Sequence, residues 1–140
     1  MKRLVLVVLI VPLLAACGGK KDVKKVSEDS KLATEAFAVA EALKDAYTRK
    51  DIAAIEKNTT KEGLQAVSRT VRSFDSADLS FTPAWVEIED GTVHLNVSWK
   101  GTWKRGSAVT EERGMAVFVM KGRPLRVDAI LRANPFRHPE

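Results

Sequence analysis

The hydrophobic period of this chain changes once, near Ala84, and that change limits the possible folds more than any other feature. Before it, apolar residues recur every three or four positions, as on one face of a helix. After it, apolar and polar residues alternate, as in strands with one buried face. Helices therefore precede strands. We expect an α+β domain in which helices pack on one face of a curved antiparallel sheet of about four strands.

Three helices are predicted before the change of period. The first carries an apolar stripe from Leu32 to Tyr47, Asp51 is placed to cap a short second helix, and residues 59–62 offer a capping box for a third. Residues 73–83 are polar and rich in turn formers, so we expect the helices to end there. The inner face of the third helix is expected to hold Leu64, Val67, Val71 and Phe74.

Three two-residue turns predict the register of the strands. Asp90-Gly91 is a strong hairpin signal, and pairing outward from it sets apolar residues opposite apolar ones. Further turns are predicted at residues 105–106 and 122–123. The predicted pairs include Ile88 with Val93, Val86 with Leu95, Glu87 with His94, Trp85 with Asn96, Trp99 with Glu112, Val97 with Gly114, Phe118 with Val127, and Ala116 with Ala129.

This register divides the sheet into two faces. The outer face would gather four aliphatic side chains, Met115, Val117, Val119 and Ile130, and such a group usually marks a partner surface. We expect a homodimer or another envelope protein to cover it. The inner face would hold Val93, Leu95, Val97, Trp99, Trp103, Ala116, Phe118, Val127, Ala129 and Leu131.

The N-terminus has the layout of an export signal. A basic pair at residues 2–3 precedes a short apolar run, Leu4 to Leu14, and Leu14-Ala15-Ala16-Cys17 follows. These residues resemble the lipobox of bacterial lipoprotein precursors. The resemblance implies that residues 1–16 are a signal peptide and that Cys17 carries acyl chains. The alternative is an ordinary secretory signal with an incidental cysteine.

The lipoprotein resemblance also predicts a location. Gly18 follows the cysteine, where an aspartate would favour retention in the inner membrane. We therefore expect a protein anchored in the outer membrane and facing the periplasm, if the cell has an outer membrane. Residues 17–29 would form the lipidated cysteine and a flexible charged tether, 30–136 a single domain, and 137–140 a tail.

Composition excludes several classes of function. The net charge of +5 is modest and its signs are interspersed, which argues against a nucleic-acid binder. Cys17 is the only cysteine, so once it is acylated no thiol remains and no disulfide can form. With His94 and His138 as the only histidines, we expect no Cys/His metal site and no cofactor. We expect His94 to form only an exposed cross-strand pair with Glu87.

The domain resembles the nuclear transport factor 2-like superfamily, which includes ketosteroid isomerases and dehydratases. The resemblance rests on residues 46–55, where the first helix turns into the second, on the hairpin at 89–92, and on the long strands that end at Arg132. It implies a cone-shaped fold over roughly residues 30–136. A cystatin-like domain, with one helix on a sheet, is the alternative.

The clearest candidate for a pocket is the stretch from Trp99 to Trp103, where two indoles project from one face. They would either close the wide end of the core or line a pocket for a small apolar ligand. Isomerases of the resembled family use a carboxylate base and a tyrosine. Glu112 is the inward strand carboxylate, whereas Asp128 points outward. The candidate pocket residues are Trp99, Trp103, Glu112, Phe118 and Tyr47.

From these observations we predict a membrane-anchored bacterial lipoprotein that acts as a non-catalytic binding or assembly module in the cell envelope. The alternative is an isomerase- or hydratase-like enzyme that uses the pocket near Trp99 and Glu112. The two differ in the polar groups of the interior: an enzyme needs at least two that converge, and a binding module needs none.

Overall fold

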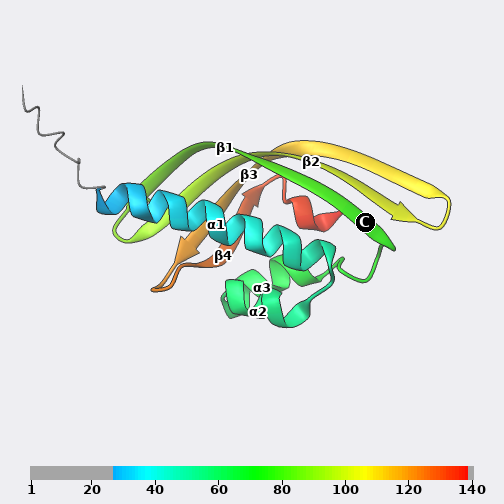
Figure 1. Cartoon of the computed structure of the whole chain (residues 1–140), viewed down its shortest axis with the longest axis horizontal. Helices are drawn as coiled ribbons and strands as arrows, with labels where there is room; N and C mark the ends of the chain where they lie inside the picture. Colours follow the sequence, from blue (N-terminus) through cyan, green and yellow to red (C-terminus); the bar gives the residue numbers. More distant parts are fainter. Residues whose placement is uncertain (1–26, 139–140) are drawn as a thin grey trace, which may run out of the picture.

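The computed structural model describes residues 27–138 (Figure 1). The predicted signal peptide, the lipobox and Cys17 lie outside the described residues. In the described part, no helix is long and apolar enough to cross a membrane. The elements in chain order are α1 (Glu28–Thr48), α2 (Ile52–Asn58), α3 (Lys61–Ser68), β1 (Ser76–Glu89), β2 (Thr92–Arg105), β3 (Ala108–Lys121), β4 (Arg126–Arg132) and the short 3-10 helix η1 (Pro135–Arg137).

The four strands form one antiparallel sheet in the order β1-β2-β3-β4, which confirms the predicted α+β architecture. The sheet arches over α1, and α2, α3 and η1 lie on the same side as α1 (Figure 1). We call the covered side the concave face and the other the convex face. This arrangement follows from the amphipathic sequence of each layer, because each helix stripe and the concave face bury one another.

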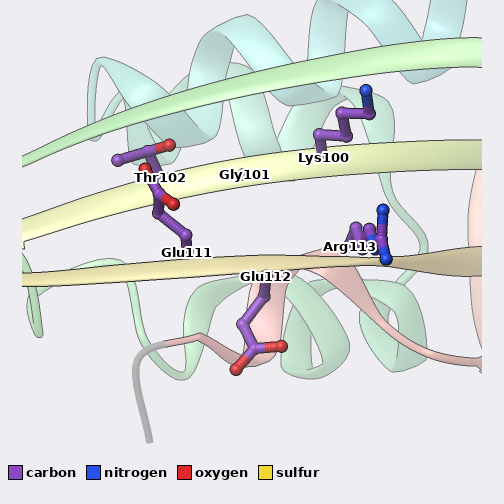
Figure 2. A pocket seen from close by; sticks show the side chains of 6 residues that line it. All are labelled: Lys100, Gly101, Thr102, Glu111, Glu112 and Arg113. Atoms are coloured by element: carbon purple, nitrogen blue, oxygen red, sulfur yellow. The ribbon is translucent and has the colours of Figure 1, made fainter.

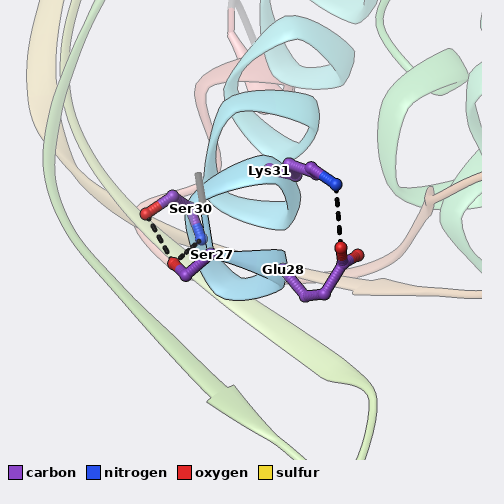
Figure 3. A network of polar contacts seen from close by, with 4 residues as sticks. All are labelled: Ser27, Glu28, Ser30 and Lys31. Carbon is purple, nitrogen blue, oxygen red and sulfur yellow. Dashed lines mark hydrogen bonds and ion pairs between the residues drawn. The ribbon is translucent and has the colours of Figure 1, made fainter. Parts of the chain in front are cut away.

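Helix α1 begins earlier than the sequence predicted. Ser27 caps it, with its Oγ accepting a hydrogen bond from the Ser30 amide at 3.1 Å, and Lys31 pairs with Glu28 at 2.8 Å (Figure 3). A serine oxygen satisfies one of the unpaired amides of the first turn, which fixes the start of the helix. Glu28 and Asp29 were predicted to end the flexible tether. They are instead the first residues of α1.

The predicted cap of α2 is confirmed, and that of α3 is wrong by one residue. Asp51 caps α2 as expected, accepting from the Ala54 amide at 3.1 Å. The cap of α3 is Thr60 rather than Thr59, so the predicted capping box does not form. Thr59 instead donates its hydroxyl proton to the carbonyl oxygen of Ile55.

Strand β1 starts at Ser76, within the stretch that the sequence predicted as a turn-rich connection. Leu79 and Phe81 are buried while Ser80 and Thr82 are exposed, so the alternation of a strand begins well before Ala84. A register shift between Pro83 and Trp85 interrupts this alternation. The proline and the polar side chains of residues 76–83 are therefore compatible with a strand, because pairing with β2 satisfies the backbone groups of β1.

The hairpin registers agree with prediction near the first turn and depart from it afterwards. The pairs around Asp90-Gly91 are confirmed, including Ile88 with Val93 and Glu87 with His94. The second turn lies at residues 106–107, one position later than predicted. As a result Trp99 pairs with Gly114 and not with Glu112. The shift is of two residues, so every side chain keeps its predicted face.

A bulge in β4 reverses the faces of the residues beyond Val127. Residues 122–125 form a four-residue loop, and the pairing shifts between Val119 and Met120. Phe118 therefore pairs with Ile130 rather than with Val127. The predicted faces of Ile130 and Leu131 were wrong: Ile130 packs against the core, whereas Leu131 is 51% exposed. An extra residue in a strand reverses every side chain beyond it.

One hydrophobic core fills the space between the helices and the concave face. It includes the apolar stripe of α1, the inner side chains of β2 and β3, and Phe136 of η1. The largest completely buried side chains are Trp103, Tyr47, Phe74, Phe118, Phe136, Leu43, Ile55, Leu95 and Met120.

Candidate functional site

The four aromatic residues that were predicted to line a pocket do lie together on the concave side of the sheet. All are buried, and their rings surround residues 133–138, which we call the C-terminal segment. The space between the rings is therefore filled by the chain itself. We call these four residues the aromatic enclosure: Tyr47, Trp99, Trp103 and Phe118.

Phe136 is the apolar anchor of the C-terminal segment. Its ring centroid lies 4.8 Å from that of Tyr47 and 6.2 Å from that of Phe118. Both contacts are tilted or edge-to-face, the geometries that aromatic pairs prefer. Phe136 is fully buried, so it occupies the position that an apolar ligand would take.

His138 extends the same contact toward the two indoles. Its ring centroid lies 5.8 Å from Trp99 and 5.3 Å from Trp103. The two indoles meet edge-to-face with centroids 6.3 Å apart. The tryptophans thus close the wide end of the core, which was one of the two arrangements that the sequence allowed.

The polar groups inside the enclosure bind the backbone of the segment. The Tyr47 hydroxyl donates to the carbonyl oxygen of His138 at 2.9 Å and lies 2.9 Å from the Thr70 hydroxyl. Thr70 donates to the carbonyl oxygen of Phe136. Burial raises the pKa of the Tyr47 phenol, although the nearby Thr70 hydroxyl and Trp103 indole oppose that shift. Tyr47 therefore stays protonated and acts as a donor.

The two indole nitrogens differ in their partners. Trp99 Nε1 donates to the carbonyl oxygen of Ala133 at 2.8 Å. Among the described residues, Trp103 Nε1 is buried and makes no hydrogen bond of ordinary geometry. A buried donor without an acceptor is uncommon in folded proteins and costs free energy.

Asn134 fixes the path of the C-terminal segment. Its side-chain amide donates to the carbonyl oxygen of Ala66 in α3 at 2.9 Å, and its Oδ1 accepts from the Phe136 amide at 2.9 Å. The asparagine is buried and caps η1. Asn134 was not among the residues predicted for the site. An asparagine before a proline does, however, favour the start of a turn.

Glycine explains how two tryptophans fit on one strand. The ring of Trp103 lies over Gly101, where a Cβ would overlap it and the side chain of Leu79. The ring of Trp99 likewise approaches Gly114, where an added Cβ would lie 3.1 Å from it. The glycine between the tryptophans is therefore a platform for a ring, a signal present in the sequence as Trp-x-Gly-x-Trp.

Glu112 does not belong to the enclosure. It pairs with Gly101 instead of Trp99, and its side chain is exposed. Figure 2 shows it on the side of the sheet opposite to Lys100 and Arg113. Among the described residues it forms no ion pair. The carboxylate that the enzyme alternative requires is thus separated from the buried aromatic groups.

A shallow hollow of about 550 Å³ lies over residues 100–102 of β2 and 111–113 of β3 (Figure 2). Lys100 and Arg113 are direct cross-strand partners, and Thr102 pairs with Glu111 in the next row. Cations and acids alternate here, so the hollow has no single sign of charge. Its lining residues are Lys100, Gly101, Thr102, Glu111, Glu112 and Arg113.

The convex face carries an apolar patch in its middle. Trp85 is 51% exposed, Met115 43% and Leu131 51%; Val117 lies in the same row as Trp85 and Leu131, and Val119 lies in the next row. Ile130, predicted for this patch, belongs to the core, and Leu131 takes its place. We call these five residues the convex patch. One row across the sheet contains Trp85, Asn96, Val117 and Leu131.

Asn96 lies in the same row and is buried although it belongs to the convex side. Its Nδ2 has no hydrogen-bond partner among the described residues. A polar group is thus enclosed among apolar neighbours on a face that no helix covers.

Asp128 of β4 forms polar contacts with β3 and with the cap of α3. Asp128 accepts from Lys121 at 2.8 Å and from the Thr60 hydroxyl at 2.9 Å. These hydrogen bonds, the one from Lys121 foremost, lower the pKa of Asp128. The pair joins the cap of α3 to the sheet. Within residues 27–138, no three His, Cys, Asp or Glu side chains gather as metal ligands would.

Comparisons with known proteins decide the fold. No family model matches the chain, and no curated protein sequence does. A solved structure of an NTF2-like superfamily protein from Salmonella enterica serovar Typhimurium matches with a TM-score of 0.65 and 12% identity, over 79% of this chain and 95% of that one. The fold is NTF2-like.

The NTF2-like fold was the first of the two folds that the sequence predicted, ahead of the cystatin-like one. At 12% identity the likeness to the Salmonella protein shows a shared fold and nothing finer. NTF2-like folds support both enzymes and non-catalytic binding proteins. The function of this chain must therefore be argued from its own residues.

Proposed function

We propose that the protein is a lipid-anchored, non-catalytic binding or assembly module of the bacterial cell envelope, whose convex patch binds a second copy of the chain. The observation that carries the proposal is the convex patch. Three large apolar side chains, Trp85, Met115 and Leu131, are each at least 43% exposed on the side of the sheet that the helices leave uncovered. Grouped exposure of this kind marks an interaction surface more often than a solvated one.

The state of the aromatic enclosure supports binding over catalysis. The hydroxyls of Tyr47 and Thr70 are both engaged by carbonyl oxygens of the C-terminal segment. The nearest inward carboxylate in the prediction, Glu112, is exposed and outside the enclosure. An isomerase or hydratase would need such groups to converge on substrate. In this arrangement they converge on the protein's own backbone.

The register of the sheet makes the convex face self-complementary. A two-fold axis parallel to the strands, between β2 and β3, would set Trp85 of each copy against Leu131 of the other. At one end of the sheet it would set Glu89, the last residue of β1, against Arg126, the first of β4. Both contacts are favourable, and a two-fold axis makes each of them twice.

Membrane confinement would strengthen this association. A lipid on Cys17 would hold the domain to one surface and raise the effective concentration of its partner. Burial of the exposed side chains of the patch, at ~25 cal/mol per Å², offers a few kcal/mol per copy. That is sufficient for a dimer under confinement, while isolated domains would dimerise only at high concentration.

The experiment for the interface is light scattering on the unlipidated chain from Ser27 onward, over a range of concentrations. We expect a concentration-dependent dimer, and a monomer for Met115→Lys. Val109→Lys is the matched control, because Val109 is 57% exposed on the same strand but outside the patch. A wild-type monomer at every concentration, or equal disruption by both variants, would contradict the homodimer.

The anchor is tested by fractionation of cells that express the full chain. Cys17→Ser should leave the membrane fraction, because acyl chains and not the folded domain hold the protein there. Wild-type protein should sediment with outer-membrane markers in a cell with two membranes. Retention of Cys17→Ser after a salt wash would argue against lipidation.

A further inference from the structure

We propose that the aromatic enclosure is a peptide-binding site, that the C-terminal segment occupies it as an intramolecular ligand, and that a linear peptide with an aromatic residue can replace the segment. The site lies on the concave side of the sheet. It is therefore distinct from the convex patch, and the proposal does not depend on dimerisation.

The segment is held as a bound peptide rather than as part of the sheet. Strand β4 ends at Arg132, whose φ of +65° turns the chain away from the ladder. The Ala133 amide still donates to the Met115 carbonyl, but none of the described residues after it, 134–138, pairs with a strand. Beyond this point the segment has one turn of 3-10 helix capped by its own Asn134, and side chains of other elements donate to three of its carbonyl oxygens.

These polar contacts are hydrogen bonds to the backbone of the C-terminal segment. Carbonyl oxygens at positions 133, 136 and 138 each accept a hydrogen bond from a buried side chain. The donors are Trp99, Thr70 and Tyr47, respectively. Every peptide carries such carbonyl groups, so the same donors can bind another chain of the same path. The donors therefore specify a class of ligand, a peptide backbone, without specifying its side chains.

The side-chain requirement comes from Phe136. Its ring lies between those of Tyr47, Phe81 and Phe118, at centroid distances of 4.8, 6.1 and 6.2 Å. A single aromatic ring in a pocket of rings is the kind of anchor that dominates binding at many interfaces. The ligand we infer is a peptide with phenylalanine or tyrosine at the position of Phe136. Its own backbone carbonyl and those on either side would accept hydrogen bonds from the donors of the site.

The segment leaves one donor of the site unused. Within residues 27–138, Trp103 Nε1 is buried beside the His138 ring and has no well-aligned acceptor, although it lies close enough to the Tyr47 hydroxyl to lower the pKa of that phenol. A buried unpaired donor is costly, and a ligand that offered a carbonyl or carboxylate oxygen here would relieve that cost. The segment is therefore an imperfect ligand for its own site, and this gives a competing peptide an advantage.

The binding test uses the full chain and a fluorescent peptide with the sequence of residues 133–138, Ala-Asn-Pro-Phe-Arg-His, measured by fluorescence anisotropy. The intramolecular segment competes at a high effective concentration, so wild-type protein should bind weakly. Phe136→Ala removes the anchor of the segment and should bind the peptide at least about tenfold more tightly. The control peptide has alanine in place of phenylalanine.

The outcomes separate the proposal from simple packing. Preference of folded Phe136→Ala for the phenylalanine peptide over the control peptide supports a peptide site. Equal binding of both peptides, or of neither, would overturn it. If Phe136→Ala does not fold, Asn134→Ala serves instead, because it loses two hydrogen bonds of the segment without emptying the enclosure.

Hydrogen exchange of the wild-type chain gives a second test that needs no variant. A displaceable segment must open without unfolding of the sheet, so the amides of Phe136 and Arg137 should exchange faster than those of β2, such as Leu95. Exchange of all these amides at the rate of global unfolding would overturn the proposal, whatever the state of dimerisation.

Discussion

The hydroxyl of Tyr47 lies 2.9 Å from the backbone carbonyl oxygen of His138, a residue 91 positions later in the chain. This hydrogen bond joins α1 to the C-terminal segment across the concave side of the sheet. It gives the chain's single tyrosine a structural role. Tyr47 was predicted as a candidate pocket residue, and the structure shows what it holds.

Tyr47→Phe should therefore lower the free energy of unfolding without changing the fold. The ring still packs against Phe136, but the carbonyl oxygen of His138 loses its donor, which costs about 1–2 kcal/mol. Urea denaturation followed by circular dichroism measures this loss. Thr34→Ala, at an exposed site on the same helix, should change stability by less than about 0.5 kcal/mol.

Gly101→Ala should be more damaging than its size suggests. The new methyl group would overlap the Trp103 ring and Leu79, so both must move, at a cost of about 1–3 kcal/mol. Thermal denaturation checks this. Ser98→Ala, at an exposed position of the same strand, is the control and should have little effect. Equal stability of the glycine variant and wild type would show that the ring is not seated as described.

The Asp128–Lys121 pair predicts how stability changes in acid. Because the pKa of Asp128 is lowered on folding, the ion pair stabilises the fold at pH values above the unfolded pKa of about 4 and is lost as the pH falls through the folded value. Asp128→Asn should be less stable at pH 7, by less than about 1 kcal/mol for so exposed a pair. The difference should vanish near pH 2, in denaturation curves measured across this range.

Glu112→Gln tests the enzyme alternative. Glu112 is exposed and makes no ion pair among the described residues, so its charge should matter neither for stability nor for function. A strain that carries this variant should behave as wild type. Loss of function in a folded Glu112→Gln protein would instead favour catalysis.

The sequence was most informative where its patterns were local. The Asp90-Gly91 turn fixed the first hairpin, and the helix stripe identified the side of α1 that meets the sheet. Both depend on residues a few positions apart, whose spacing directly sets their face. The architecture could therefore be predicted, and the comparison with solved structures agrees with it.

What could not be predicted depends on contacts between distant residues. The bulge near Asp128 reverses the faces of Ile130 and Leu131, and no turn signal marks it. The C-terminal segment was placed beyond the sheet because Pro135 cannot continue a strand. Its insertion follows from Phe136, whose ring neighbours come from α1, β1 and β3. The space beside the two tryptophans, for which the sequence allowed a closed core or a pocket, contains the C-terminal segment.

Under the proposed function, the convex patch is the interface through which the protein acts. Photo-crosslinking in living cells tests it most directly, with benzoylphenylalanine at position 115 in the patch or, as the control, at position 109 near the hairpin tip. We predict an adduct of twice the protomer mass from position 115 and none from position 109. An adduct from position 109 alone, or none from either position, would contradict the claim.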